Sequence, residues 1–194
     1  MILFRDADKL QDINIPNAVT NIGKGAFSNC SSLKKVSISN PIEIKDNTFY
    51  QCSNLEEVQL LGGALGIGDN AFYSCIKLSD ITILDVSEEY DGKYSIGANS
   101  FSKCQSLTEI TIPKNFTRIG SGAFSDCSNL EKVNILGSME FIGAGAFYGT
   151  KISSGFVEKH IRDKDIVSFV IEEGVGQIGD YTFLGAENLK SVHI

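Results

Sequence analysis

The sequence contains no tryptophan and only 3 prolines, and its acidic residues outnumber its basic ones. The 17 lysines and arginines against 24 aspartates and glutamates give a formal net charge of −7. A surface that follows a phosphate backbone needs clustered lysine and arginine, so this balance argues against nucleic acid as a partner. No apolar run approaches the roughly 18–20 residues that cross a bilayer, so we expect no membrane span in this segment.

A secretory leader is also missing from the start of the sequence. Residues 1–6 lack the basic start, the apolar stretch and the small-residue cleavage site of a signal peptide. Hydrophobic residues make up 42% of the chain and charged residues 21%, which is the composition of a chain that folds. A length of 194 residues fits one domain or two small ones.

An internal repeat covers nearly all of the chain. Residues 22–30, 67–75, 96–104 and 119–127 share the pattern Ile-Gly-x-x-Ala/Ser-Phe-x-x-Cys. The phenylalanine of this pattern, which we call the anchor, recurs with a period of about 23 residues. The anchors are Phe4, Phe27, Phe49, Phe72, Phe101, Phe124, Phe147 and Phe183.

Each anchor is followed by regularly spaced apolar residues, as in Leu33, Val36 and Ile38 after Phe27. The alternation of the last two predicts a short, half-buried strand. The spacing of the Ala, Phe, Cys and Leu positions suits a short helical turn with one apolar face. The glycine after the isoleucine, replaced only by Lys45, indicates a backbone conformation that other residues would adopt at a cost.

One such coil has too little apolar surface to fold alone, so neighbouring coils must stack. We therefore predict a single α/β domain over residues 1–194, a right-handed solenoid of about eight coils of ~23 residues. One face should carry a parallel β-sheet and the other the short helical turns. Two insertions interrupt the period, near residues 84–95 and near residues 155–167.

The unit I-G-x-x-A-F-x-x-C-x-x-L-x-x-V-x-I-P resembles the BspA-type leucine-rich repeat of bacterial and protist surface proteins. The match is closest over residues 27–41 and 101–113. The resemblance implies a leucine-rich-repeat fold, a cell-surface or secreted location, and an adhesion-like role. Its partners would be a protein or polysaccharide ligand, with host matrix proteins among the candidates.

The register of the repeat at the two ends suggests a segment of a longer array. Phe4 already occupies an anchor position, Ile194 occupies the last strand position, and neither end shows a polar capping repeat. We expect a signal peptide upstream of this segment. Open ends would also allow end-to-end self-association.

The outward positions of the predicted strands are the best candidates for a ligand site, because alternation points them away from the core. In several coils these positions are polar and of mixed charge, and they are almost free of aromatic residues. The candidate residues are Lys35, Ser37, Glu57, Gln59, Glu109, Thr111, Lys132 and Asn134. Asp80 and Thr82 occupy the same two rows.

The first insertion adds Tyr90 and Tyr94 to the candidates. Insertions in solenoids form loops on one face, often the binding face. Tyrosine is enriched at protein interfaces, so these two side chains are expected to contact a protein ligand.

Each of the five cysteines lies three residues after an anchor: Cys30, Cys52, Cys75, Cys104 and Cys127. Other coils place Ala7 or Thr150 in this column, which therefore favours a small buried residue. No close C-x-x-C pair suggests zinc. We predict neither a metal nor a cofactor.

His160 and His193 have no catalytic partners that spacing identifies, so we assign no catalytic residues and expect no enzyme. The sequence therefore favours a non-enzymatic module that recognises a protein or glycan through the sheet face and the inserted loops. A structural spacer that displays another domain, with no ligand of its own, is the alternative.

Overall fold

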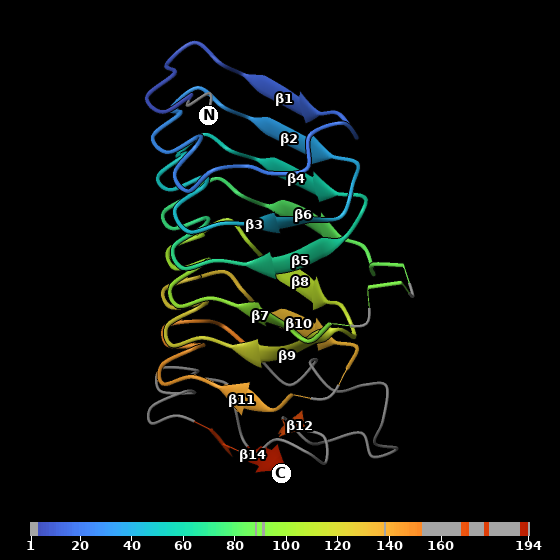
Figure 1. Cartoon of the computed structure of the whole chain (residues 1–194). Coiled ribbons are helices and arrows are strands. Elements are labelled where there is room, and N and C mark those ends of the chain that lie inside the picture. The colour runs from blue at the N-terminus through green and yellow to red at the C-terminus, as the bar shows by residue number, and fades with distance from the viewer. Residues whose placement is uncertain are drawn as a thin grey trace.

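The computed structural model describes residues 4–152 apart from residues 88, 91 and 138, together with the backbone of residues 168–170, 177–178 and 191–193. The described chain winds into a solenoid whose coils stack along one axis (Figure 1). The second insertion, the anchor Phe183 and His160 lie outside the described residues.

The V-x-I segments form short parallel strands, as the alternation predicts. Val36 pairs with Val58 and Ile38 with Leu60, and these side chains point into the core with almost no exposure. Their outer surface, which we call the first face, is shared by six strands within residues 4–152. The strands are β1 (Asp12–Ile15), β2 (Lys35–Ile38), β4 (Glu57–Leu60), β6 (Asp80–Ile83), β8 (Glu109–Ile112) and β10 (Lys132–Ile135).

A second parallel sheet, which the repeat pattern did not predict, is formed by the return segments of the coils, whose strands point in the opposite direction to those of the first face (Figure 1). Its strands end at the isoleucine of the Ile-Gly pair, and their apolar side chains, such as Ile44 and Ile96, pack into the same core. Its strands are β3 (Ile42–Ile44), β5 (Ala64–Ile67), β7 (Tyr94–Ile96), β9 (Phe116–Ile119), β11 (Phe141–Ile142) and β13 (Gln177–Ile178). Towards the C-terminus, β12 (Ser168–Val170) pairs with β14 (Ser191–His193).

The predicted helical turns are wrong for the described coils, where the anchor segments form strings of hydrogen-bonded turns. In the second coil the N–H groups of Ala26 and Ser28 bond within the coil, whereas those of Gly25 and Phe27 donate to the next coil. In an α-helix, each of these N–H groups would instead bond to the carbonyl four residues earlier in the same coil. Residues two before and two after the anchor, such as Gly25 and Asn29, have φ near +60°, which breaks a helix.

The core is a stack of identical side chains. Anchors from Phe4 to Phe147 stack with ring centroids 5.1–5.5 Å apart and nearly parallel planes. Each cysteine thiol donates to the carbonyl of the anchor one coil earlier, at 3.0 Å from Cys52 to Phe27 and at 3.2 Å from Cys75 to Phe49. The cysteines therefore connect coils as well as filling space.

The Ile-Gly glycines are needed for a different reason from the one predicted. Gly68, Gly97, Gly120 and Gly143 are not among the residues with positive φ. A Cβ on any of them would lie 2.3–2.6 Å from a backbone nitrogen of the preceding coil. Close approach between coils, not an unusual φ, therefore excludes a side chain.

The described residues provide six strands on the first face, so the predicted total of eight coils is not confirmed. The right-handed winding remains a prediction. Within the described residues, no helix combines the length and the apolar character that crossing a bilayer requires.

Candidate functional site

The candidate residues of the first face lie in two rows, one at the first strand position and one at the third. On the N-terminal side, Lys35 of β2 forms a 2.7 Å ion pair with Glu57 of β4. The hydrogen bond from Lys35 to Glu57 raises the pKa of the lysine. Gln59 donates to Glu57 at 2.7 Å, and Ser37 lies beside Gln59 in the strand register. These four residues form one polar cluster.

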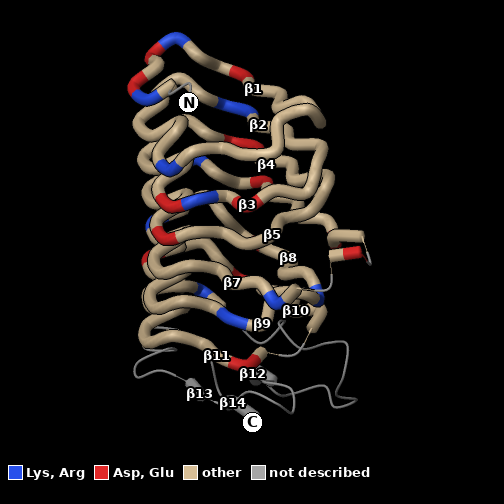
Figure 2. The backbone as a smooth tube through the Cα atoms, in the orientation of Figure 1, with Lys and Arg blue, Asp and Glu red and all other residues tan. Residues whose placement is uncertain are grey.

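The other four strand candidates form a second cluster on β8 and β10. Lys132 pairs with Glu109 at 3.4 Å, and the Asn134 amide donates to Thr111 at 3.2 Å. Charges of both signs are spread along the solenoid (Figure 2). The structure therefore divides the predicted continuous face into two clusters whose charged groups are already paired with each other.

Between these clusters the first face is interrupted. Strands β1, β2, β4 and β6 form one sheet and β8 with β10 another, and no ladder joins β6 to β8 in the described residues. Residues 84–93 separate β6 from β7, whereas residues 61–63 separate β4 from β5. The connection in this coil is therefore seven residues longer, next to the point where the ladder is interrupted.

Proline strengthens this interruption. In three other coils, the residue after the first-face strand donates its N–H to the last strand residue of the preceding coil: Leu61 to Ile38, Leu84 to Leu60 and Leu136 to Ile112, at 2.8–3.2 Å. After β8 this position is Pro113, which has no N–H group. The bond that would hold β8 against Ile83 therefore cannot form.

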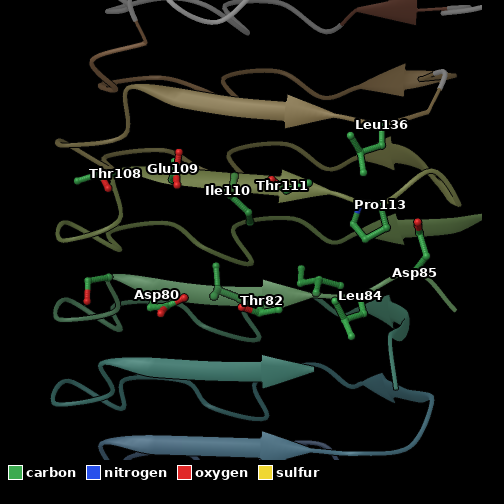
Figure 3. Close-up of a pocket in the computed structure, with 13 residues that line it drawn as sticks. Asp80, Thr82, Leu84, Asp85, Thr108, Glu109, Ile110, Thr111, Pro113 and Leu136 are labelled. Atoms are coloured by element: carbon green, nitrogen blue, oxygen red, sulfur yellow. The ribbon is translucent and has the colours of Figure 1, made fainter. Parts of the chain in front are cut away.

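The interruption opens a cleft of about 630 Å³ between β6 and β8. This size falls within the range of small-ligand pockets. Asp80 and Thr82 lie on one side and Glu109 and Thr111 on the other, as Figure 3 shows. At the carboxyl ends of the strands, the same view shows apolar side chains beside a carboxylate. They are Leu84, Pro113, Leu136 and Asp85.

Sequence reasoning placed Asp80 and Thr82 in the outward rows but missed the apolar end of the cleft. Leu84 and Leu136 are 46% and 58% exposed, although most leucines of the repeat are buried. Two signals could have revealed the cleft. They are the lengthened coil and the proline directly after the β8 strand.

Tyr90 and Tyr94 do not join the first face. Tyr94 begins β7 in the second sheet and packs edge-to-face on Phe116, with ring centroids 6.0 Å apart. Its hydroxyl donates to the Tyr90 carbonyl, which also accepts from Asn115 at 3.1 Å. The two tyrosines fasten the inserted loop to the next coil, and Tyr90 lines a separate hollow of about 410 Å³.

The described residues contain no group of three or more His, Cys, Asp or Glu side chains placed to hold a metal ion. The five cysteines are buried and free. Burial raises the pKa of the Cys52 thiol to about 12, and it also raises the pKa of the Cys75 thiol well above its ordinary value. Such thiols are poor nucleophiles, because the thiolate is the reactive form.

Comparison with solved structures finds bacterial repeat proteins. A leucine rich cell surface protein from Faecalibacterium prausnitzii is 30% identical over 94% of this chain, with a TM-score of 0.60. The chain spans 38% of that protein's length. A Treponema pallidum leucine rich repeat protein is 24% identical over 95% of this chain and 70% of its own, with a TM-score of 0.59.

A leucine-rich repeat protein from Bacteroides ovatus is also 24% identical, over 97% of this chain and 56% of its own, with a TM-score of 0.57. At 24% identity the last two likenesses concern the fold alone. None of the curated proteins compared with the chain matches it. A model of the BspA type leucine rich repeat region matches residues 2–94, 88–165 and 159–194. The chain therefore belongs to the BspA-type leucine-rich repeat family.

Proposed function

We propose that this chain is a non-enzymatic recognition or adhesion module of a bacterial cell-surface protein. Its ligand would be a protein or a polysaccharide, with host matrix proteins among the candidates. The observation that carries the proposal is the first face, where six strands present two rows of polar side chains over a buried core. Such a surface is formed before the ligand arrives, so binding orders little of the scaffold.

The proposed location at the cell surface rests on the similarity of this chain to a solved bacterial structure. The similar F. prausnitzii protein is described as a cell surface protein, and this chain spans only part of it. A role in recognition is the usual use of an extended solenoid surface. The inserted loop with Tyr90 lies away from the first face and would extend the contact area around the solenoid.

The test is a binding screen of the purified chain against extracellular-matrix proteins and a glycan array. A fourfold alanine variant at Lys35, Glu57, Glu109 and Lys132 should lose a saturable hit. The fold should survive, because exposed ion pairs contribute only about 0–1 kcal/mol each. A matched control changes two lysines and two glutamates elsewhere, at Lys9, Lys77, Glu43 and Glu89, all exposed. Equal loss of ligand binding in both variants would contradict the assignment of the binding site to the first face.

A spacer that displays another domain is the second candidate. The observation in its favour is that the charged groups of the first face pair with each other, as Lys35 does with Glu57. A screen without any saturable hit, from a chain with an intact fold, would support the spacer over the recognition module.

A further inference from the structure

The cleft between β6 and β8 differs from the rest of the first face in its charge balance. Lys35 and Lys132 are each committed to a glutamate on a neighbouring strand. Asp80 lies between these two pairs, is exposed, and has no cation within ion-pairing distance among the described residues. Asp85, at the other end of the cleft, accepts the Lys114 backbone N–H at 3.2 Å and pairs with no cation in the part of the chain that the structure describes. The cleft therefore carries uncompensated negative charge.

The same cleft ends in an exposed apolar patch. Leu84 and Leu136 flank Pro113, whose side chain is buried between the coils. Asp80, Thr82 and Leu84 share one side of their strand, since side chains alternate along it. At about 3.3 Å per residue, Asp80 and Leu84 are about 13 Å apart along β6. An acidic group, hydroxyl groups and aliphatic groups thus follow one another in a line.

The strand edges that face the cleft are also unusual. In the other coils, neighbouring first-face strands exchange backbone hydrogen bonds, as in the ladders of β4 with β6 and β8 with β10. The facing edges of β6 and β8 have no such ladder. Cα atoms of β6 and β8 still approach within 8 Å of each other, whereas a strand between them would need roughly 9.5 Å. A ligand would therefore lie over the cleft and contact the side chains that line it. A glycan would favour aromatic side chains, and none lines this cleft, whereas its unpaired carboxylates favour a peptide that carries a basic side chain.

We propose that the cleft between β6 and β8 binds an extended segment of a protein partner that carries an arginine or lysine and, four residues away, an aliphatic side chain. The basic group pairs with Asp80, the intervening polar residue meets Thr82 and Thr111, and the aliphatic group packs on Leu84 and Leu136. The inference rests on the proposed function, since it names the ligand class of one part of that face.

The probe is a capped seven-residue peptide with arginine at its second position, leucine at its sixth, and serine or threonine elsewhere. Titration into the isotope-labelled full chain should shift backbone amide signals of residues 79–85 and 108–113 saturably. A matched peptide with citrulline keeps the shape of arginine but not its charge. It should bind about fivefold more weakly or worse, because charge-assisted hydrogen bonds are roughly twice as strong as neutral ones.

Two variants locate the site. Asp80→Asn should weaken binding of the arginine peptide about fivefold or more. Asp12→Asn removes the same charge from the same row on β1 and should leave the affinity unchanged. Both variants should keep the wild-type denaturation midpoint, since both side chains are exposed. Equal weakening by the two variants, or equal binding of the citrulline peptide, would overturn the proposal.

Ligands other than a peptide would give different results in these experiments. A glycan ligand that is lost on Asp80→Asn, with no peptide binding, would replace the peptide proposal. Signal shifts at the cleft that depend on protein concentration without peptide would indicate a second copy of the chain and overturn it too. If a matrix protein binds and Asp80→Asn has no effect, while the fourfold variant loses that ligand, the cleft assignment fails and the proposed function stands.

Discussion

At the scale of single residues, the close stacking of coils sets what each position tolerates. Gly120 lies where a Cβ would meet the Gly97 carbonyl carbon and the Ala98 nitrogen at 2.6 Å. Gly25, by contrast, has a φ of +63° and open space, with its nearest neighbour 3.9 Å from a hypothetical Cβ. The first glycine is required by distance and the second by conformation.

We predict that Gly120→Ala destabilises the protein by about 1–3 kcal/mol, because backbone atoms of the preceding coil cannot move aside cheaply. Gly25→Asn should change stability by less than about 0.5 kcal/mol, since asparagine tolerates a positive φ. Asn47, Asn70 and Asn99 adopt this conformation at the equivalent position. Urea denaturation measures both variants, and a larger loss for Gly25→Asn would contradict this account of the two glycines.

The cysteine column makes a prediction about alkaline pH. Burial raises the pKa of Cys52 from 9.0 to about 12, so the folded protein keeps a proton that the unfolded chain releases. The stabilisation from this thiol is therefore complete below about pH 9 and is lost as pH rises towards 12. Each such group lowers the unfolding free energy by up to about 1.4 kcal/mol per pH unit in that window.

Comparison of wild type with Cys52→Ala isolates this effect from other groups that titrate at high pH. Denaturant midpoints between pH 8 and pH 11 should show wild-type stability falling faster than that of the variant above pH 9. Parallel pH profiles would mean that the thiol titrates normally in the folded protein.

At the scale of elements, the sequence pattern predicts the first-face strands correctly, but its prediction of helical turns is wrong. The V-x-I alternation predicted the first-face strands because burial on one side of a strand imposes a period of two. The anchor segment has helix-like spacing, yet its column of Gly25, Asn47 and Asn70 indicates positive φ. Hydrogen bonds to the next coil, which no local pattern reveals, decide between the two structures.

The candidate site also has a part that the sequence predicts and a part that it does not. Outward positions such as Lys35 and Glu109 follow from alternation alone. Their ion pairs with strands 22 or 23 residues away depend on coil register, which the repeat period predicts well. The cleft depends on how a longer connection and Pro113 act together on β6 and β8, and only the three-dimensional structure shows that result.

Pro113 offers a test of why the first face splits. Pro113→Ala supplies the N–H group that equivalent residues donate to the preceding coil, as Leu84 donates to Leu60. The new bond would add about 0.5–1.5 kcal/mol, and loss of proline rigidity in the unfolded chain would subtract about 0.4–1 kcal/mol. Stability should therefore change by less than about 1 kcal/mol.

Hydrogen exchange distinguishes the outcomes for this variant. The amide of residue 113 should exchange slowly, at a rate comparable to that of Leu84, if its hydrogen bond to Ile83 forms. Rapid exchange would show that the longer connection alone keeps β6 and β8 apart. The amide of Leu136, one coil further on, serves as the unchanged reference.

At the scale of the whole molecule, the junction between β6 and β8 is a weak point between neighbouring coils of residues 4–152. β6 and β8 have no ladder, and β5 pairs with β7 only through Ile67 and Ile96. The turns are still connected across the junction. The Phe72 backbone N–H donates to the Ser100 carbonyl at 2.7 Å, and the Phe72 and Phe101 rings stack with centroids 5.1 Å apart. Strand pairing between the coils is therefore reduced in both sheets at this junction, whereas the bonds between the turns and the ring stacking are kept.

In a solenoid, stability is a sum of coil terms and nearest-neighbour terms, so a weak junction lets the two sides open separately. We predict that Phe49→Leu, which should cost roughly 1–2 kcal/mol, speeds amide exchange in β2 and β4 about tenfold. Exchange in β9 and β10 should change by less than about twofold, because their opening does not require the N-terminal coils to open.

Phe124→Leu provides the mirror experiment on the other side of the junction, and both rings are fully buried. It should speed exchange in β9 and β10 and leave β2 and β4 nearly unchanged. If either variant raised exchange equally on both sides, the stacked rings and turn bonds across the junction would suffice to couple the whole array. The solenoid would then open as one cooperative unit, and the cleft would be a local feature of its surface without any consequence for the stability of the coils around it.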